Sequence, residues 1–246
     1  MGTAASSPAN LSKLKSREEV AERSMAFHFE KPSGWTFKAG QSMDMTLLDP
    51  SETDTEGNTR AFSVASAPHD ESLMVATRMR DTAFKRVLSA LPLGTPVKIE
   101  GPFGNLTLHN NAARTAVFLT GGIGITPFRS IVSRAAREKL PHRLFLFYSN
   151  RRPEDAAFLE ELQALERQSA NYKFIPTMTE MAKSRRPWNG ETGQINKEML
   201  SMHLKNAASP IYYIAGPPGM VKGLHETLSK TGVDDDDIRT EEFSGY

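Results

Sequence analysis

The pattern of apolar residues changes near residue 112, and this change constrains the fold more than any other feature of the chain. Beyond it, short apolar runs alternate with helical patterns. The runs that predict strands lie at 115–120, 143–150, 172–179, 210–216 and 237–243, and those that predict helices at 126–139, 153–168, 196–204 and 218–232. Such alternation is typical of a doubly wound parallel sheet. We therefore expect an α/β domain over residues 112–246.

Residues 11–109 have a different pattern, in which apolar and polar residues alternate over short stretches separated by turn residues. The stretches that predict strands are 24–32, 42–48, 73–79 and 96–104, with one helix expected at 81–91. Several short strands with one helix suggest a small antiparallel barrel or sandwich. We expect residues 1–10, rich in Ser and Ala, to form a disordered tail.

Composition excludes several classes of function. The 246 residues carry a formal net charge of +1, so bulk charge gives no reason to expect binding to nucleic acid. There is no cysteine, which excludes disulfides, iron–sulfur clusters and thiol nucleophiles. The six histidines have no ligand-like spacing, so we expect no metal site. No apolar run reaches the roughly 18 residues of a membrane span, and no secretory signal is evident. We expect a cytoplasmic protein.

A cluster of glycines, TGGIGITP at 120–127, joins the first expected strand of the α/β domain to its first helix. Glycine permits positive φ and close approach of a ligand to the backbone. Thr126 could cap the helix and Pro127 suits its first position. Helix N-termini bind anions such as a pyrophosphate. A tight turn without any ligand fits these residues equally well.

Two further strand ends bear on function, because ligands of open α/β sheets bind beyond the carboxyl ends of the strands. Ser149, Arg151 and Arg152 follow one strand, and Gly216 and Pro217 follow another. The two arginines could meet a ribose or its phosphate, or they could simply be surface charge.

The barrel half contains RAFS at 60–63. An arginine, an aromatic ring and a hydroxyl on one strand could hold a charged aromatic cofactor by an ion pair, ring stacking and a hydrogen bond. Taken alone, a phenylalanine such as Phe62 is more often a core residue than a cofactor partner.

Taken together and in order, RAFS, GPFG at 101–104, TGGIGITP, AGPPGM at 215–220 and the terminal EEF at 241–243 resemble the ferredoxin–NADP(H) reductase family over residues 15–246. The resemblance implies an N-terminal Greek-key barrel that binds FAD and a C-terminal domain that binds NADP(H) or NAD(H). The flavin would lie between the two domains.

For the flavin, the resemblance implies that Arg60 pairs with the pyrophosphate and that Phe62, in place of the usual tyrosine, packs on the isoalloxazine. Ser63 would lie near flavin N5. The remaining residues implied to contact FAD are Val64, Thr77 and Met79 on the barrel strands, the backbone amides of Thr82, Ala83 and Phe84 at the barrel helix, and the aromatic residues Phe243 and Tyr246 near the C-terminus.

For the nicotinamide nucleotide, the resemblance implies that residues 120–126 cradle the pyrophosphate and that Glu241 contacts the nicotinamide. The individual residues are Thr120, Gly121, Gly122, Ile123, Gly124, Thr126, Pro127, Ser149, Arg151, Arg152, Gly216, Pro217 and Met220. Ala215 stands where many relatives have a cysteine. Arg151 and Arg152 favour the 2′-phosphate of NADPH, since arginine binds phosphate with two hydrogen bonds.

The resemblance implies an enzyme that passes a hydride from the nicotinamide to the flavin, with Ser63 and Glu241 as the assisting residues. Electrons would go on to a separate acceptor, either a redox protein such as ferredoxin or flavodoxin or a small molecule. Two alternatives remain open: a free-flavin or ferric-chelate reductase, and an electron-relay or regulatory module that does not oxidise NAD(P)H.

Overall fold

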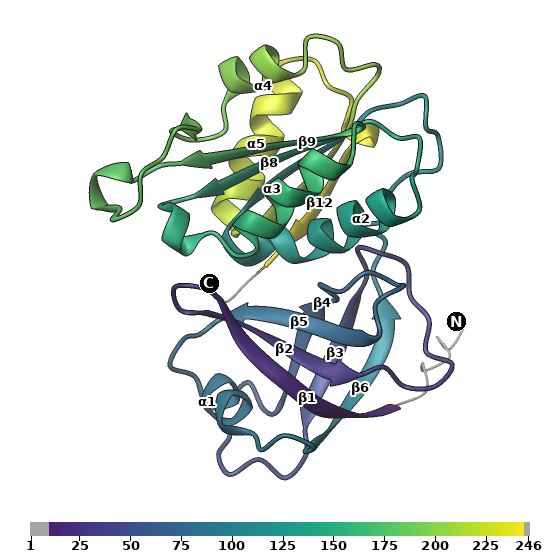
Figure 1. Cartoon of the computed structure of the whole chain (residues 1–246), viewed down its shortest axis with the longest axis vertical. Coiled ribbons are helices and arrows are strands. Elements are labelled where there is room, and N and C mark those ends of the chain that lie inside the picture. Colours follow the sequence, from purple (N-terminus) through teal and green to yellow (C-terminus); the bar gives the residue numbers. More distant parts are fainter. Residues whose placement is uncertain (1–9, 244–246) are drawn as a thin grey trace.

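The computed structural model describes residues 10–243, which form the two domains expected from the sequence, one above the other (Figure 1). The lower domain is a barrel-like antiparallel sheet with strand order β4-β3-β6-β1-β2-β5. The Ala65 amide donates to the Met74 carbonyl at 2.7 Å and so joins the two edge strands. The elements are β1 (Asn10–Ala21), β2 (Ser24–Glu30), β3 (Ser42–Leu47), β4 (Thr59–Ser63), β5 (Ser72–Arg78), α1 (Ala83–Ala90) and β6 (Pro96–Phe103).

Alternation along these strands builds the barrel core. In β3, Met43, Met45 and Leu47 are buried, whereas their polar neighbours are partly exposed. They meet Phe27 and Phe29 of β2, whose apolar side chains also point inward. Burying one face of each strand fixes the strand register, because a slip by one residue would expose the whole apolar set.

The upper domain is a parallel sheet with strand order β10-β9-β8-β7-β11-β12. Its helices cover both faces: α2 and α3 pack in one apolar cluster and α4 and α5 in another. The elements are β7 (Ala116–Gly121), α2 (Thr126–Arg137), β8 (Leu144–Asn150), α3 (Leu159–Gln168), β9 (Tyr172–Met178), β10 (Glu191–Thr192), α4 (Lys197–His203), β11 (Ile211–Gly216), α5 (Pro218–Lys230) and β12 (Ile238–Glu242).

Local structure differs from the sequence predictions at several points. β1 and the two-residue β10 were not predicted, and Asn10 belongs to β1 rather than to a tail; the rest of the predicted tail lies outside the described residues. The helix predicted at 153–168 is interrupted. A 3-10 turn covers Pro153–Asp155, and α3 begins only at Leu159, after Phe158, whose φ is +60°. The left-handed Phe158 breaks the helix and buries its ring, whose centre lies 4.9 Å from the Arg129 guanidinium.

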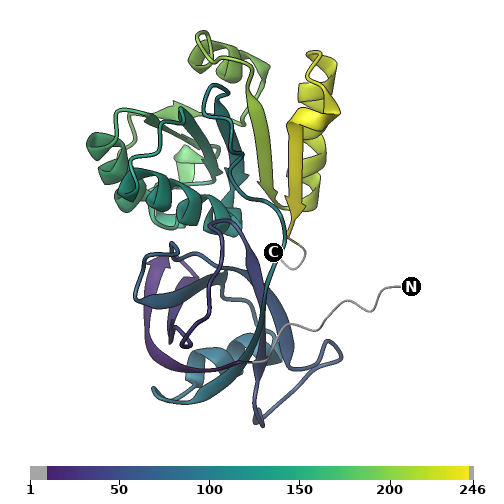
Figure 2. The same ribbon diagram turned by 90° about the vertical axis from the view of Figure 1, so that its right-hand side faces the viewer.

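The domains meet through the first helix of the α/β domain, which lies above the barrel in both ribbon views (Figures 1 and 2). The Ser130 hydroxyl donates to the Ser66 carbonyl at 2.6 Å, and the Arg129 guanidinium donates to the Ala65 carbonyl at 2.7 Å. Ser66 and Ala65 closely follow RAFS. The glycine turn, which precedes α2, is thereby held close to the predicted flavin strand.

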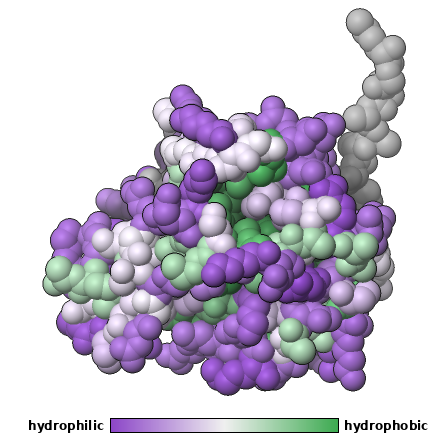
Figure 3. Space-filling model, turned by 90° about the horizontal axis from the view of Figure 1, so that it is seen from above, coloured by the Kyte–Doolittle hydropathy of each residue, from purple (hydrophilic) through white to green (hydrophobic). Residues whose placement is uncertain are grey.

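The end of the α/β domain that faces away from the barrel is mostly hydrophilic, with apolar side chains gathered in a central hollow (Figure 3). Across residues 10–243, no helix combines the length and the hydropathy needed to cross a membrane.

Candidate functional site

The glycine turn runs from strand to helix without a loop. β7 ends at Gly121, a 3-10 turn covers Gly122–Ile125, and α2 begins at Thr126. The prediction that Thr126 caps the helix is wrong, because the cap position is Ile125 and the Thr126 hydroxyl donates to the Ile123 carbonyl at 3.1 Å. Pro127 is accordingly the second residue of the helix, where its missing N–H is still without cost.

Gly124 explains why the turn carries proline where the usual dinucleotide fingerprint has a third glycine. In that fingerprint the third glycine allows the helix to pack closely on the strand. Here a Cβ at Gly124 would lie 2.6 Å from the Ala215 carbonyl oxygen and 2.8 Å from the Gly216 Cα. Gly124 therefore provides the close approach to β11, and Pro127 is free to start α2.

Two side-chain hydrogen bonds fix the turn. The buried Tyr148 hydroxyl donates to the Gly122 carbonyl at 3.0 Å, and the Thr120 hydroxyl donates to the Ala215 carbonyl at 2.8 Å. Thr120 is therefore a tie between strands rather than a ligand-facing group. The Gly122 carbonyl oxygen, which would repel an anion, is therefore directed at the Tyr148 hydroxyl.

A cleft of about 560 Å³ opens beside this turn. Six predicted residues line it: Gly121, Gly122, Ser149, Arg151, Pro217 and Met220. Ile123, Gly124 and Gly216 lie in the neighbouring backbone but are not part of the lining. The sequence analysis missed the other ten lining residues, which are Arg78, Asn150, Asp155, Thr179, Gln194, Ile195, Gly219, Gly223, Leu224 and Thr227.

Asn150 tests whether this cleft fits a polar ligand. Its side chain is 6% exposed, and its Nδ2 has no hydrogen-bond partner among the described residues. It lies near the Tyr148 hydroxyl, but the two do not meet in hydrogen-bond geometry. A buried donor without a partner costs about 1–3 kcal/mol. An acceptor on a dinucleotide, such as a ribose or phosphate oxygen, would satisfy it, so the cleft fits NAD(P)(H).

The two arginines after β8 have different environments. Arg151 lines the cleft and pairs with Asp155 at 3.0 Å. Arg152 pairs with Asp155 at 2.9 Å and with Glu22 of the barrel at 2.8 Å, and these carboxylates raise its pKa. Arg152 does not line the cleft, so its position gives no support to the predicted contact with the nucleotide. Burial alone would raise the pKa of Asp155, but the Arg152 hydrogen bond and the charges of Arg151 and Arg152 outweigh it, so the pKa is lowered.

Ser63 and Glu241, predicted as the assisting pair, meet across the domain boundary. The Ser63 hydroxyl donates to Glu241 Oε1 at 3.4 Å. Burial raises the pKa of Glu241, and the Ser63 hydrogen bond opposes part of that shift. Beside them the Phe243 amide donates to the Gly216 carbonyl at 3.0 Å, which ties the C-terminal segment to β11. Tyr246 lies outside the described residues.

The other predicted flavin residues are mostly buried in the barrel. Phe62 is 9% exposed and its ring centroid lies 5.9 Å from that of Phe84. Val64 is fully buried and Thr77 nearly so, so these two can offer a ligand mainly backbone groups. The Met79 amide donates to the Arg23 carbonyl at 2.7 Å and is therefore already used.

Cations gather at the start of α1. The Arg60 guanidinium lies 5.1 Å from the centre of the Phe84 ring, and Lys85 Nζ donates to the Arg78 carbonyl at 2.8 Å. Burial, followed by the charges of Arg80 and Arg60, lowers the pKa of Lys85 to about 8. This excess of positive charge is what a pyrophosphate would neutralise, so the residues fit the phosphates of FAD.

The amides predicted to bind these phosphates are partly available. The Thr82 amide donates to the Arg80 carbonyl at 2.9 Å. Ala83 and Phe84 are the first residues of α1, where backbone amides have no acceptor within the helix. Lys85 was missed because a lysine on a helix carries no motif. Arg60 also pairs with Asp54 at 3.1 Å and with Glu56 at 3.0 Å, so a phosphate would share its guanidinium with these carboxylates.

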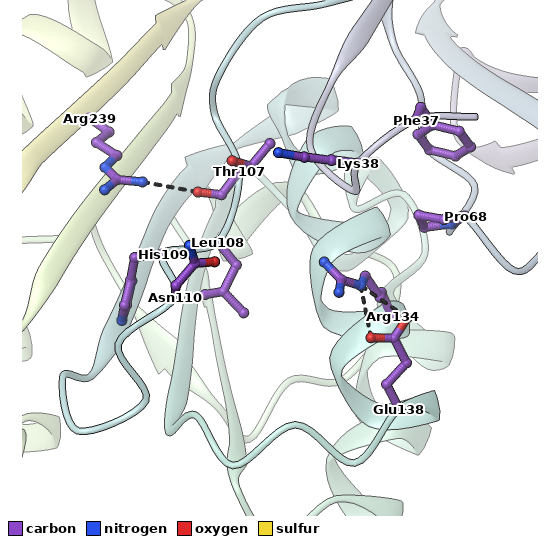
Figure 4. A pocket seen from close by; sticks show the side chains of 10 residues that line it. All are labelled: Phe37, Lys38, Pro68, Thr107, Leu108, His109, Asn110, Arg134, Glu138 and Arg239. Atoms are coloured by element: carbon purple, nitrogen blue, oxygen red, sulfur yellow. Dashed lines mark hydrogen bonds and ion pairs between the residues drawn. The ribbon is translucent and has the colours of Figure 1, made fainter. Parts of the chain in front are cut away.

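A second cavity, of about 550 Å³, lies where the chain crosses between the domains (Figure 4). Arg239 donates to the Thr107 carbonyl at 3.0 Å across it, and Arg134 pairs with Glu138 at 3.0 Å. Its lining contains none of the predicted residues that the structure describes. We therefore place the functional site at the glycine cleft and the Ser63–Glu241 contact.

Comparison with known proteins bears on the α/β domain and on the fold of the whole chain. Residues 118–226 match the family model for the oxidoreductase NAD-binding domain. Over 202 residues the chain is 29% identical to a subunit of the Na⁺-translocating NADH-quinone reductase of Methylococcus capsulatus, covering 76% of this chain and 49% of the relative. The corresponding protein of Haemophilus ducreyi is also 29% identical, over 201 residues, with the same coverage. The chain spans about half the length of these curated relatives.

Solved structures share the whole two-domain fold. A ferredoxin–NADP⁺ reductase from Neisseria gonorrhoeae with bound FAD and NADP has a TM-score of 0.75 at 23% identity, covering 95% of this chain and 98% of that one. The cytochrome P450 reductase GcoB of Amycolatopsis has a TM-score of 0.80 at 18% identity, covering 98% and 72%. The chain therefore contains an oxidoreductase NAD-binding domain over residues 118–226 and has the two-domain fold of ferredoxin–NADP(H) reductases, a fold that fits FAD and NAD(P)(H) as cofactors.

Proposed function

We propose that the protein is an NAD(P)H-dependent flavin oxidoreductase that passes electrons to a separate acceptor. The observation that carries the proposal is the Ser63–Glu241 contact, in which a hydroxyl from the flavin strand meets a carboxyl group from the nucleotide-binding domain. Bound FAD would supply the chemistry that accepts a hydride and releases electrons one or two at a time.

The residues of this chain would hold and orient the two cofactors. The cations beside α1 would bind the FAD phosphates, and the glycine turn would bind the dinucleotide phosphates through backbone amides. Arg78, the one barrel residue that lines the cleft, would add a charge to the nucleotide from the other domain. Ser63 and Glu241 would keep water away from the reacting rings and hold them in place by hydrogen bonds.

Ferredoxin or flavodoxin is one candidate acceptor, as the family resemblance suggests. A second candidate comes from the curated relatives, which are subunits of a Na⁺-translocating NADH-quinone reductase. A role as the NADH-oxidising part of a larger assembly is therefore also proposed. The cytoplasmic location expected from the sequence stays a prediction that cell fractionation can test.

Anaerobic titration tests the proposal. Purified protein is expected to carry a yellow flavin that NADH or NADPH bleaches, and Glu241→Gln is expected to slow this bleaching about 10- to 100-fold at unchanged FAD affinity. A colourless protein that oxidises NAD(P)H only with added flavin would indicate a free-flavin reductase. A yellow protein inert to both nucleotides would indicate a relay module. Reoxidation by ferredoxin, flavodoxin and a water-soluble quinone would then rank the acceptors.

A further inference from the structure

The strand order of the parallel sheet determines which half of a bound dinucleotide lies over which strands, and this assignment rests on the proposed function. The pyrophosphate would lie at the glycine turn after β7, and the strands run in the order β10-β9-β8-β7-β11-β12. Ser63 and Glu241 lie on the β11–β12 side of that turn, so the nicotinamide must point to that side. The adenosine half must therefore extend across the ends of β8 and β9, where Asp155 and Thr179 line the cleft.

Asp155 is held there by two arginines. Its Oδ1 accepts from Arg151 at 3.0 Å, and its Oδ2 accepts from Arg152 at 2.9 Å, with its side chain only 8% exposed. Arg152 is in turn held by Glu22 at 2.8 Å, and Arg185 also pairs with Glu22 at 2.5 Å. Each of the two arginines that follow β8 therefore already has a carboxylate partner, with Arg151, Arg152 and Arg185 sharing the carboxylates of Asp155 and Glu22.

A carboxylate at this position suits a ribose diol and opposes a phosphate. The arginines take three of its about four acceptor positions, which leaves one for a ribose hydroxyl of NADH. A 2′-phosphate would lie against this carboxylate, and Arg151 and Arg152 would first have to leave Asp155 to bind it. We infer that Asp155 makes the cleft select NADH over NADPH, contrary to the preference that Arg151 and Arg152 suggested from the sequence.

Glu22 extends the inference to the barrel. It lies in the turn between β1 and β2, and its amide donates to the Glu154 carbonyl at 2.8 Å, next to Asp155. By holding Arg152 it keeps that guanidinium on Asp155 and away from the cleft. Glu22 is thus a positioning residue that acts on coenzyme choice from the other domain.

Calorimetric binding of ADP-ribose and of 2′-phospho-ADP-ribose to the full chain tests the inference without turnover. We expect the wild type to bind ADP-ribose at least about tenfold more tightly. Asp155→Asn should lower the ratio of the two affinities, ADP-ribose over 2′-phospho-ADP-ribose, about tenfold. Glu22→Gln should lower the same ratio by a few fold. As a matched control, Glu180→Gln removes a nearby carboxylate that pairs with Lys183 outside the cleft lining, and should leave the ratio unchanged.

Three outcomes would count against the inference. A wild type that prefers the phosphorylated ligand, or a ratio unchanged in both Asp155→Asn and Glu22→Gln, overturns it while the proposed function stands. A wild type that binds neither ligand overturns both. If Asp155→Asn does not fold, Glu22→Gln, which changes a residue of the barrel, still decides the question.

Discussion

The two phosphate-binding regions of this protein are built on different principles. At the glycine turn, a continuous stretch of backbone between β7 and α2 faces the cleft, with Gly121 and Gly122 in its lining. Beside α1, the charge comes from side chains, above all Arg60 and Lys85, which belong to different elements. The first region gains its charge from peptide dipoles, and the second gains it from formal charges, of which Arg60 already pairs with the carboxylates of Asp54 and Glu56.

The two regions should therefore respond to different substitutions: the glycine turn to changes in shape, and the region beside α1 to changes in charge. A backbone site depends on close packing, so it should fail when an added methyl group moves the turn, and it should respond little to pH. A cationic site tolerates changes in shape but should depend on each charge and on the protonation of its lysine. Substitutions that affect one region and leave the other intact can establish whether the division is real.

Gly124→Ala should have the largest effect. Its Cβ would lie 2.6 Å from the Ala215 carbonyl oxygen, and neither backbone segment can yield, so we expect a loss of about 3 kcal/mol. This corresponds to a fall in Tm of about 6 to 12 °C for a chain of this size. Nucleotide binding should weaken with it, whereas FAD should still bind the barrel. Thermal unfolding and titrations with both cofactors would measure these changes.

Gly223→Ala is the matched control for this prediction. Gly223 also lines the cleft, but it lies within α5 and a Cβ there meets nothing within 4 Å. Alanine should therefore be tolerated or slightly stabilising. If Gly124→Ala is as stable as Gly223→Ala, close packing does not explain the glycine turn.

The same division shows what sequence could and could not predict. The two domains and the glycine turn followed from contiguous motifs in a fixed order, and the family resemblance named Ser63 and Glu241 separately but not their contact. Asp155, Asn150 and Lys85 did not, because each acquires its role from burial and local backbone geometry that no sequence motif marks. Asp155 closes a 3-10 turn after β8, where a continuous helix was predicted, and Arg152 reaches Glu22 across 130 positions.

Arg60→Ala should affect the cationic region alone. Loss of a charged hydrogen bond to phosphate costs about 1.5–3 kcal/mol, which is about 10- to 150-fold in FAD affinity. Arg86→Ala is the control, because Arg86 pairs with Glu52 and Asp81 on the exposed side of α1. Flavin fluorescence titrations would report both affinities. Equal losses in the two variants would mean that general surface charge, rather than Arg60, binds the flavin.

Protonation of Lys85 should have the smallest effect on FAD affinity. This effect is also the one most specific to a site built from formal charges. The Lys85 pKa of about 8 lies below that of an ordinary lysine, because burial and the charges of Arg80 and Arg60 disfavour the ammonium, with Glu56 acting in the opposite sense. A bound phosphate would favour the ammonium and raise this pKa. Binding of FAD should therefore take up a proton above pH 8, and affinity should fall as pH rises, by at most about tenfold per pH unit.

In the protein without flavin, titration of Lys85 makes the free energy of unfolding rise with pH, whereas it makes FAD affinity fall with pH. The unfolded chain keeps its lysine protonated up to about pH 10.5, whereas the folded chain releases that proton near pH 8. Between these values the unfolded state binds more protons, so the contribution of Lys85 makes stability rise with pH. Lys85→Gln should remove both slopes while nucleotide binding at the glycine turn keeps its pH profile. An FAD affinity that falls just as steeply above pH 8 in Lys85→Gln would assign the titration to another group and leave Arg60 as the main charge on the flavin phosphates.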